Sequence, residues 1–526
     1  MSKKYATKSF LLTGSVSWIG LPGIASRQRQ PVVIYDNRII ISLYAPAASR
    51  WSCREREKMA QEAGNLPTTT RRVFMGAAAL TAASYKRVLG ANDRIGIGFI
   101  GFGLIGKQHV ADFKKLTNEV DLVGMCDVYK PRVQAGLEFL GNPHGQGYSD
   151  FRKMFENKDI QGVVVATPDH WHALLTIMAC AAGKDVYVEK PMTVCIDEGK
   201  WMIQAARKYK RIVVVGTQRR HGTGVAEAKK LVDGGSLGKI HSIRIASYRN
   251  IYPGFGKTPI EDPPSELDYD MWQGPAPKRP YTKHRALYHF RWFWDYSGGQ
   301  MTNLGAHTID QVLWLMKVKG PSMVMSTGGR YALEDDGETP DLQDALWVFP
   351  TFTMNYAIRE ANAMHGDPAA RGQLYCGTKG TMTLAGGYEV TPELRIDPVN
   401  DIPKFSGHPV GGPVYSDVKP APWIQPSKGG VESDARYGTG GEDTMLMNER
   451  DWLNSMRTRN RPLCEVEDGH RVSIACHLAN MSLRLGRAIR WDPEKEQVIG
   501  DREAAAMCVR PYRAPWEGVL KSFVQV

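Results

Sequence analysis

Three features that mark whole classes of protein are missing from this sequence of 526 residues. It has no run of about 18 uninterrupted apolar residues, so we expect no membrane-spanning segment in the mature chain. Its eight cysteines are scattered and form no CxxC pair or Cys/His cluster with the spacing of zinc ligands. The spacing of His284, His289 and His307 also fits no usual ligand set, and no metal site is expected.

A basic surface is missing from the body of the chain as well. The net charge is +12, but residues 1–91 hold 14 Lys and Arg against 4 Asp and Glu, which leaves 53 against 51 for residues 92–526. A nearly neutral body offers no basic stripe to a phosphate backbone, so no nucleic-acid partner is expected. Hydrophobic residues make up 42% of the chain, which is the composition of a folded protein.

The basic residues 1–91 have the features of a leader. Residues 68–84, TTTRRVFMGAAALTAAS, join an Arg pair to an Ala-rich apolar segment, which is the layout of a twin-arginine export signal. Because such a signal belongs near a chain start, we expect translation to begin at Met59. Residues 1–58 would then be an over-extension, and residues 59–91 would contain the signal.

Two alternatives for this region stay open. Residues 3–26 have the character of a general secretory signal, and the whole region could also be a basic tail without regular structure. Either signal predicts an exported, periplasmic protein, and we favour the twin-arginine route, which carries proteins already folded around a cofactor.

A dinucleotide-binding motif follows the leader. Residues 94–110, RIGIGFIGFGLIGKQHV, contain an apolar strand, then GxGxxG at Gly101, Gly103 and Gly106, then an amphipathic segment. The first Gly permits a tight turn, the second lets the backbone approach a pyrophosphate, and the third lets helix and strand pack closely. The free N–H groups at the start of the helix would then face the phosphates.

The next strand tests this interpretation. The stretch VDLVGMCD ends in Asp127, about twenty residues after the last glycine of the motif, where a carboxylate can accept hydrogen bonds from ribose hydroxyls. A carboxylate there repels a 2′-phosphate, so the sequence favours NAD over NADP. The alternative role for Asp127 is that of a turn residue at the end of a strand.

Apolar strands and helices continue to alternate up to residue 218, which predicts a parallel sheet covered on both faces. The strand-like and helical stretches are 160–168, 171–184, 185–190, 196–209 and 211–218. Ligands on such sheets bind beyond the carboxyl ends of the strands. Thr167-Pro168 and Glu189-Lys190 occupy such ends, and we assign residues 92–218 to a Rossmann domain of the α/β class.

The motifs GFIGFGLIG, ATPDHWH, VEKPM and GGQMTNLGAHTID, in this order, resemble the Gfo/Idh/MocA (glucose-fructose oxidoreductase / inositol dehydrogenase) family. The resemblance covers residues 92 to about 515, and the motifs GTKGTMTL, HLANMSLRLGRAIRWDP and RPYRAPW look like those of a subgroup of exported members. It implies a second, α+β domain over residues 219–526 with a large, open, mainly antiparallel sheet. Helices would cover one face of the sheet, and the other face is often used for oligomerisation, so a dimer or tetramer is expected.

The sequence of the second domain agrees in part with this expectation. Residues 239–248 and 344–358 have the pattern of strands, and residues 447–459 and 472–486 have the pattern of helices. Residues 386–441 are rich in Gly and Pro and predict long loops.

The family implies a reaction and a cofactor. Its members move a hydride between nicotinamide and a hydroxyl-bearing carbon, usually of a sugar, polyol or sugar derivative. The cofactor contacts that the resemblance and the motif imply are Gly101, Gly103, Leu104, Ile105, Gly106, Asp127, Thr167, Pro168, His172, Glu189 and Lys190.

Two residues match the acid/base groups of the family. Lys190 matches the catalytic Lys, and burial beside the cofactor would lower its pKa toward the working range. His307 matches the catalytic His. If residues 303–316 are helical, Ile309, Val312, Leu313 and Met316 form an apolar stripe, and Asn303, His307 and Asp310 lie on the opposite face. Ordinary roles, a solvent-exposed Lys and a capping His, are the alternatives.

The sequence departs from the family at Asn303, where better-known dehydrogenases carry Asp. Asn can donate and accept hydrogen bonds, but it cannot take a proton. Either Lys190 and His307 suffice, or Asp310 supplies the missing carboxylate, or the reaction differs from simple dehydrogenation. Asp310 could equally be a plain helix residue.

A carbohydrate site is expected just before this segment, where aromatic and polar residues mix. The candidates are Arg291, Trp294, Asp295 and Tyr296, although aromatic core packing would explain the Trp residues equally well. Three functions stay open: an NAD-dependent dehydrogenase, an NAD-dependent glycosidase or lyase that oxidises transiently without net redox change, and a cofactor-binding protein without catalysis. The intact Lys190 and His307 argue against the third.

Overall fold

The computed structural model describes residues 94–364, 366–367, 372–395, 421–430 and 443–526, together with the backbone of residues 32–35 and 38–41. The chain divides into two units, Met1–Val88 and Leu89–Val526. In the first unit β1 (Val32–Tyr35) and β2 (Arg38–Ile41) pair in antiparallel fashion. The predicted twin-arginine segment lies outside the described residues. Within the described ranges, no helix is long and apolar enough to cross a membrane.

The second unit begins with a six-stranded parallel sheet, which confirms the predicted Rossmann fold. The strand order is β5-β4-β3-β6-β7-β8. The bounds are β3 Ile95–Ile100, β4 Val120–Cys126, β5 Gln146–Tyr148, β6 Gly162–Val165, β7 Asp185–Val188 and β8 Val213–Val215. The strand order reverses at β3, and on such sheets ligands bind beyond the carboxyl edge at this switch point.

Three helices of this domain were expected, one from the glycine motif and two from the alternation of strands and helices: α3 Leu104–Phe113, α6 His172–Ala181 and α7 Ile196–Lys208. Two further helices, α4 Lys130–Leu140 and α5 Phe151–Glu156, were not predicted. The residues of β6, β7 and β8 are all buried, because helices cover both faces of the sheet.

The large sheet of the C-terminal part has ten strands in the order β18-β15-β14-β13-β9-β12-β11-β10-β19-β20. The bounds are β9 Ile240–Tyr248, β10 Met323–Gly329, β11 Leu342–Val348, β12 Thr353–Arg359, β13 Gln373–Gly377, β14 Gly380–Ala385, β15 Gly387–Pro392, β18 Ser427–Gly429, β19 Ile489–Asp492 and β20 Gln497–Val498. Only β9 and β12 pair in parallel. This confirms the large, open, mainly antiparallel sheet.

One face of this sheet carries the core, and none of the helices in the described part of the chain covers the other face. The helices over the buried face are α8 (Thr223–Asp233), α11 (Gly305–Met316) and α13 (Val466–Leu485). Because strand residues alternate between faces, Ile243 and Trp347 are buried under the helices. Met325 and Leu346 lie on the other face and are 43% and 38% exposed.

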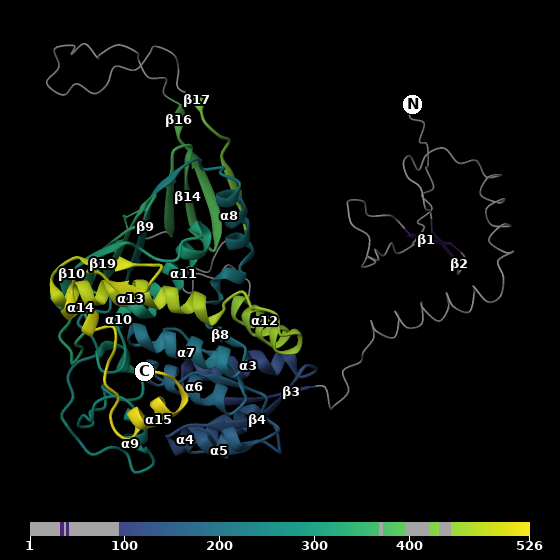
Figure 1. Ribbon diagram of the computed structural model, residues 1–526, viewed down its shortest axis with the longest axis vertical. Helices are drawn as coiled ribbons and strands as arrows, with labels where there is room; N and C mark the ends of the chain where they lie inside the picture. The colour runs from purple at the N-terminus through teal and green to yellow at the C-terminus, as the bar shows by residue number, and fades with distance from the viewer. Residues whose placement is uncertain are drawn as a thin grey trace, which may run out of the picture. The chain divides into compact units, whose positions relative to one another are not determined.

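Helix α13 is the layer shared by the two sheets. It packs against α7 of the Rossmann domain on one side and against β10 and α11 on the other. Figure 1 shows it running between the ten-stranded sheet and the Rossmann helices. Its buried residues contribute to two cores, since Ile474 and Leu478 join the core under the large sheet and Val466 joins the Rossmann core.

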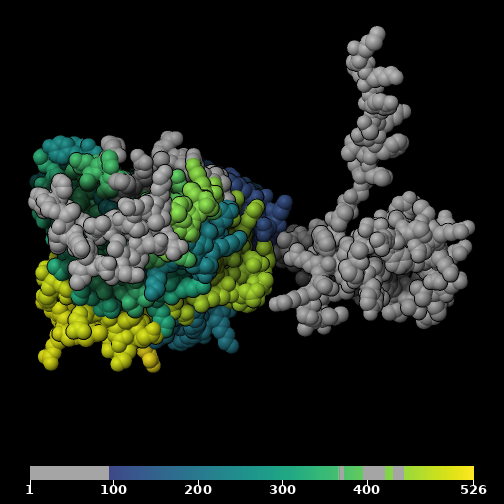
Figure 2. All heavy atoms as spheres, turned by 90° about the horizontal axis from the view of Figure 1, so that it is seen from above, coloured from purple at the N-terminus to yellow at the C-terminus, as the bar shows by residue number. Residues whose placement is uncertain are grey.

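Two C-terminal helices return to the Rossmann domain. Trp452 of α12 (Thr444–Thr458) is fully buried in the core beneath β3 and β4, and Trp516 of α15 (Trp516–Phe523) packs on the side of α6. In the space-filling view the yellow-green atoms of α12 border dark blue atoms of the first Rossmann elements (Figure 2). Residues after 219 therefore complete the Rossmann core as well as the second domain.

The prediction of long loops over residues 386–441 is wrong for part of this stretch. It contains β15 and β18, which extend the large sheet, and a separate pair of short strands, β16 (Leu394–Arg395) and β17 (Ala421–Pro422). Pairing with the sheet satisfies the backbone there in spite of the high Gly and Pro content. The remaining part of this stretch lies outside the described residues.

Candidate active site

The glycine loop has the geometry that a dinucleotide requires. Gly101 has φ +94°, in the left-handed region that favours glycine, and a Cβ there would meet the Ala166 carbonyl oxygen at 2.6 Å. A Cβ on Gly106 would meet the Gly101 carbonyl oxygen at 2.0 Å, so this residue allows helix and strand to pack. Gly103 has nothing within 4 Å of its Cβ position, and its backbone is open to a ligand.

A cavity of about 380 Å³ lies over this loop. Seven of the predicted cofactor residues line it: Gly101, Gly103, Leu104, Ile105, Asp127, Thr167 and Pro168. Its far wall comes from the second domain and includes Trp272, Tyr288 and Arg291. A cavity bounded by the glycine loop and a carboxylate fits a dinucleotide.

Asp127 stands at the end of β4 and has two functions. Its Oδ2 accepts a hydrogen bond from the backbone N–H of Phe102 at 2.9 Å, and its Oδ1 accepts one from that of Tyr129 at 3.0 Å. Burial raises the pKa of this carboxyl, and the positive charge of Arg132 opposes the shift. Asp127 is thus a turn residue that ties the glycine loop to β4, and each oxygen still has a lone pair for a ribose hydroxyl.

Thr167 and His172 belong to the loop after β6. Thr167 lines the cavity, and its hydroxyl has no hydrogen-bond partner among the described residues. His172 is 1% exposed, and its ring nitrogens lie 2.7 Å from the Pro191 carbonyl oxygen and 2.8 Å from that of Thr167. The structure therefore favours a bracing role for His172, between two loops, over the direct cofactor contact that we expected.

Lys190 follows β7 at the same edge of the sheet. Its Nζ donates to Asn303 Oδ1 at 3.1 Å and to the Asn303 carbonyl oxygen at 3.3 Å. Burial lowers the pKa of Lys190, and the positive charges of Arg291 and Arg219 lower it further, against the opposing charge of Glu189. An ammonium that is easily deprotonated is suited to proton transfer.

His307 lies on α11, one turn after Asn303. Neither ring nitrogen has a hydrogen-bond partner in the described part of the chain, and Nδ1 is buried. Burial, with the charges of Lys190 and Arg219, holds the pKa of His307 well below its usual range, so the imidazole is neutral near pH 7. A buried imidazole without a partner is rare in proteins unless a ligand supplies one.

The expected helix over residues 303–316 is interrupted. Asn303 ends a short helix, α10 (Gly299–Asn303), and α11 begins at Gly305. The predicted apolar stripe is confirmed, because Ile309, Val312 and Leu313 are buried in the core under the large sheet and Met316 packs against it.

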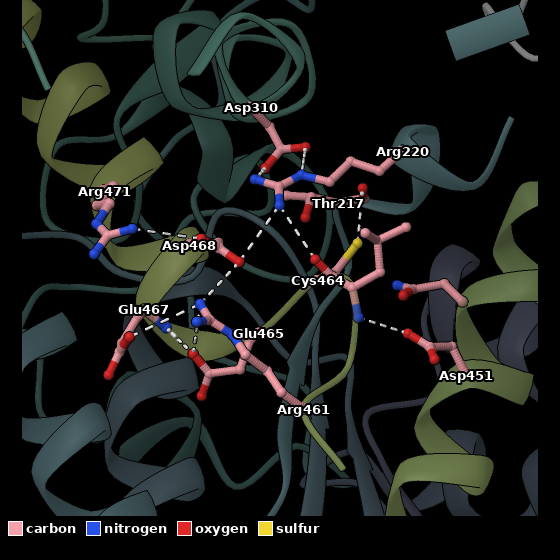
Figure 3. A network of polar contacts seen from close by, with 12 residues as sticks. Thr217, Arg220, Asp310, Asp451, Arg461, Cys464, Glu465, Glu467, Asp468 and Arg471 are labelled. Atoms are coloured by element: carbon pink, nitrogen blue, oxygen red, sulfur yellow. Dashed lines mark hydrogen bonds and ion pairs between the residues drawn. The ribbon is translucent and has the colours of Figure 1, made fainter. Parts of the chain in front are cut away.

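Asp310 is occupied by a structural partner. It is fully buried, and its two oxygens accept hydrogen bonds from Arg220 Nε at 2.8 Å and Nη2 at 2.7 Å. Arg220 also reaches the Leu463 carbonyl oxygen and Asp468, and Figure 3 shows this network joining α11 to the start of α13. The geometry therefore favours an anchoring role for Asp310 over the catalytic role considered from the sequence.

Glu189 is likewise held away from the cavity, in a buried ionic triad. The ring nitrogens of His109 lie 3.0 Å from Glu189 Oε1 and 2.7 Å from Glu449 Oε1. Burial alone would lower the pKa of His109, but the two carboxylates outweigh it and raise this pKa to about 10. Glu189 thus supports the loop before Lys190 through His109 and α12, and Oε2 accepts the Lys190 backbone N–H at 3.1 Å.

The candidate carbohydrate residues divide between the cavity and the core. Arg291 lines the cavity, and its Nη1 donates to the Tyr288 carbonyl oxygen at 2.9 Å. Asp295 forms an ion pair with Arg279, and Tyr296 is fully buried in an aromatic cluster. Core packing is therefore the correct explanation for Tyr296.

Sequence reasoning missed Arg219, which lies in the short 3₁₀ helix Gln218–His221 that follows β8. Its positive charge acts on both Lys190 and His307, yet its guanidinium makes no hydrogen bond or ion pair within the described ranges. The signal was the pair Arg219-Arg220 just beyond an apolar strand, at the edge where ligands bind. The described residues contain no group of three His, Cys, Asp or Glu placed to hold a metal ion.

Known structures share this fold. The WlbA dehydrogenase of Bordetella pertussis, in complex with NADH and UDP-GlcNAcA, has a TM-score of 0.53 and 18% identity, covering 76% of this chain and 99% of its own. Levoglucosan dehydrogenase, in complex with NADH and L-sorbose, has a TM-score of 0.55 and 18% identity over the same shares. At such identities the similarity concerns the fold alone.

Two inositol dehydrogenases are related in sequence over part of their length. Inositol 2-dehydrogenase of Salmonella typhimurium is 30% identical over 143 residues, which are 27% of this chain and 42% of that protein. Myo-inositol 2-dehydrogenase of Thermotoga maritima is 30% identical over 151 residues, 29% of this chain and 44% of its own. The chain thus matches less than half the length of these relatives.

Two models of one oxidoreductase family match this chain in succession. The NAD-binding Rossmann fold of the family matches residues 95–217, and its C-terminal alpha/beta domain matches residues 221–357 and 444–518. The order of the two matches is the order of the two sheets described above. The chain belongs to the Gfo/Idh/MocA family of oxidoreductases.

Proposed function

We propose that this protein is an NAD-dependent dehydrogenase or reductase that acts on a hydroxyl-bearing carbon of a sugar, polyol or sugar derivative. The observation that carries the proposal is that Lys190, at the edge of the sheet where the glycine loop also lies, is close enough to His307 for its charge to lower the pKa of His307. Both pKa values are lowered by burial and neighbouring cations, and the ring of His307 has no protein partner within the described residues. A substrate hydroxyl would supply that partner.

The two residues have complementary roles at one oxygen. Oxidation of an alcohol removes the O–H proton while a hydride leaves the carbon, and bound nicotinamide accepts that hydride. The neutral imidazole of His307 accepts the proton. The Lys190 ammonium donates a hydrogen bond to the same oxygen and stabilises the negative charge that develops on it. In the reverse direction His307 returns the proton, and Lys190 keeps its hydrogen bond to the same oxygen.

Asn303 takes part through Lys190. Its side-chain oxygen accepts from Lys190 Nζ, so a neutral group fills the position of the family's Asp. Because Asn303 brings no negative charge, it leaves the pKa of Lys190 low. We assign Asp310 to anchoring α11, outside the reaction.

We assign NAD as the cofactor. Leu104, Ile105 and the three glycines would hold the pyrophosphate at the start of α3, and Asp127 would accept the ribose hydroxyls. Thr167 and Pro168 would border the nicotinamide half of the cofactor. Arg132, which lines the cavity and acts on Asp127 by its charge, would suit a 2′-phosphate, and this makes the choice between NAD and NADP testable.

Export and assembly complete the proposal. The twin-arginine segment at residues 68–84 supports a periplasmic enzyme that folds around its cofactor before transport. The uncovered face of the ten-stranded sheet, with Met325 and Leu346 exposed, supports a dimer or tetramer. Mass spectrometry of the N-terminus of the mature protein and light scattering of the purified protein would test these two points.

The main experiment is a substrate screen on the purified protein. Bound nicotinamide is first determined, and sugars, polyols and aryl glycosides are then tested for NADH absorbance and for aglycone release. Net NADH formation supports the dehydrogenase. Glycoside cleavage that needs only catalytic NAD would refute it and support the glycosidase, which Asn303 leaves open.

Variants test the roles of the two residues. Lys190→Met and His307→Ala should each reduce kcat at least a hundredfold, because a proton donor or acceptor is lost, and should leave NAD binding nearly unchanged. The matched control is Lys230→Met, which removes an exposed lysine of α8. A rate within a few fold of the native enzyme in either active-site variant would refute the assignment.

A further inference from the structure

A line of buried hydrogen bonds leads from Lys190 into the large sheet. Lys190 Nζ donates to Asn303 Oδ1 at 3.1 Å, and Asn303 Nδ2 donates to Gln300 Oε1 at 2.9 Å. Gln300 Nε2 then donates to Glu360 Oε1 at 2.9 Å. Glu360, at the end of β12, is held by Arg249, whose Nε donates to Oε1 at 2.7 Å and whose Nη2 pairs with Oε2.

Glu360 determines which way the amide groups of Gln300 and Asn303 are turned in this series of hydrogen bonds. A carboxylate paired with Arg249 can only accept, so the NH₂ group of Gln300 must face it. The Gln300 oxygen then points the other way and accepts from the NH₂ group of Asn303. The Asn303 oxygen is left facing Lys190, as a cation requires.

Burial gives this orientation its strength. Gln300 and Glu360 are each 2% exposed, so water cannot replace a lost partner. Turning the Asn303 amide over would set its NH₂ group against Lys190 and its oxygen against the oxygen of Gln300. Unpaired or opposed polar groups inside a protein are costly, and the observed orientation is the one that satisfies every group.

We propose that Gln300, oriented by Glu360, is a positioning residue that holds the Asn303 oxygen against Lys190. The proposal rests on the function of Lys190 given above and explains why Asn can stand at this position. Either oxygen of an Asp would accept from Lys190 whichever way the side chain turned. An Asn side chain has a single acceptor oxygen, so a neighbouring residue must fix the orientation of the amide for that oxygen to face Lys190.

The alternative is that Gln300 only ties α10 to the sheet. The two cases differ in the pKa of Lys190, because an aimed oxygen favours the ammonium form. Other charges act on Lys190 and stay in place in the variants. They are Glu189 and Asp169, which raise its pKa, and Arg291 and Arg219, which lower it.

The first test measures Lys190 directly and needs no substrate. The rate at which acetic anhydride acylates Lys190 is followed against pH by peptide mass spectrometry, because only the neutral amine reacts. Gln300→Met keeps the length of the side chain and removes its polar end. It should lower the pKa of Lys190 by about one unit, which corresponds to an acceptor lost from the ammonium.

The matched control is Gln373→Met, since Gln373 is also a buried amide of the large sheet and is bonded to Gln311 of α11. It should leave the pKa of Lys190 unchanged. If Gln300→Met does not fold, Glu360→Gln serves instead, because it keeps the shape and removes the group that dictates direction. No change in the pKa of Lys190 in either variant would overturn the proposal.

The second test uses residue 303 itself. Gln300→Met should lower kcat about tenfold at the alkaline side of the pH profile in the native background. Combined with Asn303→Asp it should have no such effect, since a carboxylate needs no aiming. Equal losses in both backgrounds would show a structural role only.

The outcomes separate this inference from the proposed function. If the pKa of Lys190 falls in Gln300→Met but no sugar or polyol is turned over, the positioning role stands and the proposed function fails. If turnover requires Lys190 but its pKa does not respond to Gln300→Met, the function stands and the positioning role fails.

Discussion

Arg220 donates hydrogen bonds to both carboxylate oxygens of Asp310, at 2.8 Å from Nε and 2.7 Å from Nη2, with both side chains almost fully buried. This pair fixes the helix that carries His307 to the segment just beyond the last Rossmann strand, which carries Arg219. The ion pair, drawn in Figure 3, therefore holds the element that carries His307 against the element that carries Arg219.

Loss of the Arg220–Asp310 pair should strongly reduce the free energy of unfolding. Asp310→Leu leaves the buried Arg220 guanidinium with only the Leu463 carbonyl oxygen and the more distant Asp468, and we expect the free energy of unfolding in urea to fall by about 3–5 kcal/mol. The double variant Arg220→Met/Asp310→Leu removes both charges and should recover most of the loss. Asp310→Leu with native stability would contradict the anchoring role.

A second prediction concerns the stability of the protein at different pH values. The folded-state pKa of His109 is raised to about 10, above its unfolded value of 6.5. Its contribution is therefore complete below pH 6.5 and is lost as pH rises toward 10. The free energy of unfolding should fall across this window by an amount on the order of a few kcal/mol.

The double variant His109→Gln/Glu449→Gln removes two of the three titrating groups of the triad and should flatten this pH dependence. Glu449 is included because its own pKa is raised, to about 7, mainly by burial. The exposed His144→Gln serves as the control and should keep the native slope. Denaturant titrations at intervals of half a pH unit would show whether the slope survives in the double variant.

The Rossmann fold could be predicted from the sequence because the motifs that indicate it lie close together along the chain. The glycine motif, the apolar strands after it and Asp127 lie within about 35 residues, and periodicity alone separates strands from helices there. The large sheet was expected from the family resemblance. Residues 386–441 were misjudged because Gly and Pro content says nothing about pairing with distant strands.

The hydrogen-bond partners of the site residues could not be predicted from the sequence, because each residue and its partner are far apart along the chain. Lys190 and Asn303 are 113 positions apart, and His109 and Glu449 are 340 apart. On the sequence alone, Asp310 could be assigned to a catalytic face as readily as to the core. The structure shows that the carboxylate of Asp310 is bonded to Arg220, which lies 90 positions earlier in the chain.

A third prediction follows from the neutral side chain at residue 303. Asn303→Asp places a negative charge at the oxygen that contacts Lys190 Nζ at 3.1 Å. An opposite charge at this distance raises the pKa of Lys190 by about 1–3 units. Since the ammonium form is the one that stabilises the reacting oxygen, activity should persist to higher pH by the same shift.

The pH dependence of kcat measures this directly. Asn355→Asp, at an exposed position of β12, is the control for the added charge. An alkaline limb that stays in place or moves to lower pH in Asn303→Asp would refute the role of Lys190 as the ammonium donor.

The fourth prediction concerns the choice of cofactor. Asp127→Asn removes the negative charge that would repel a 2′-phosphate, and its one amide oxygen can keep the hydrogen bond from Phe102 N–H of the glycine loop while the bond from Tyr129 N–H is lost. Arg132, whose charge already acts on Asp127, then becomes free to pair with that phosphate. The ratio of the Kd for NADP to the Kd for NAD should fall at least tenfold, through weaker NAD binding, stronger NADP binding or both. Titration of the intrinsic fluorescence with each cofactor gives both constants.

Asp121→Asn, at the exposed start of the same strand, should leave the ratio unchanged, and Asp127→Asn/Arg132→Gln should lose the gain in NADP binding. If the single variant still rejects NADP as strongly as the native protein does, Asp127 does not select the cofactor.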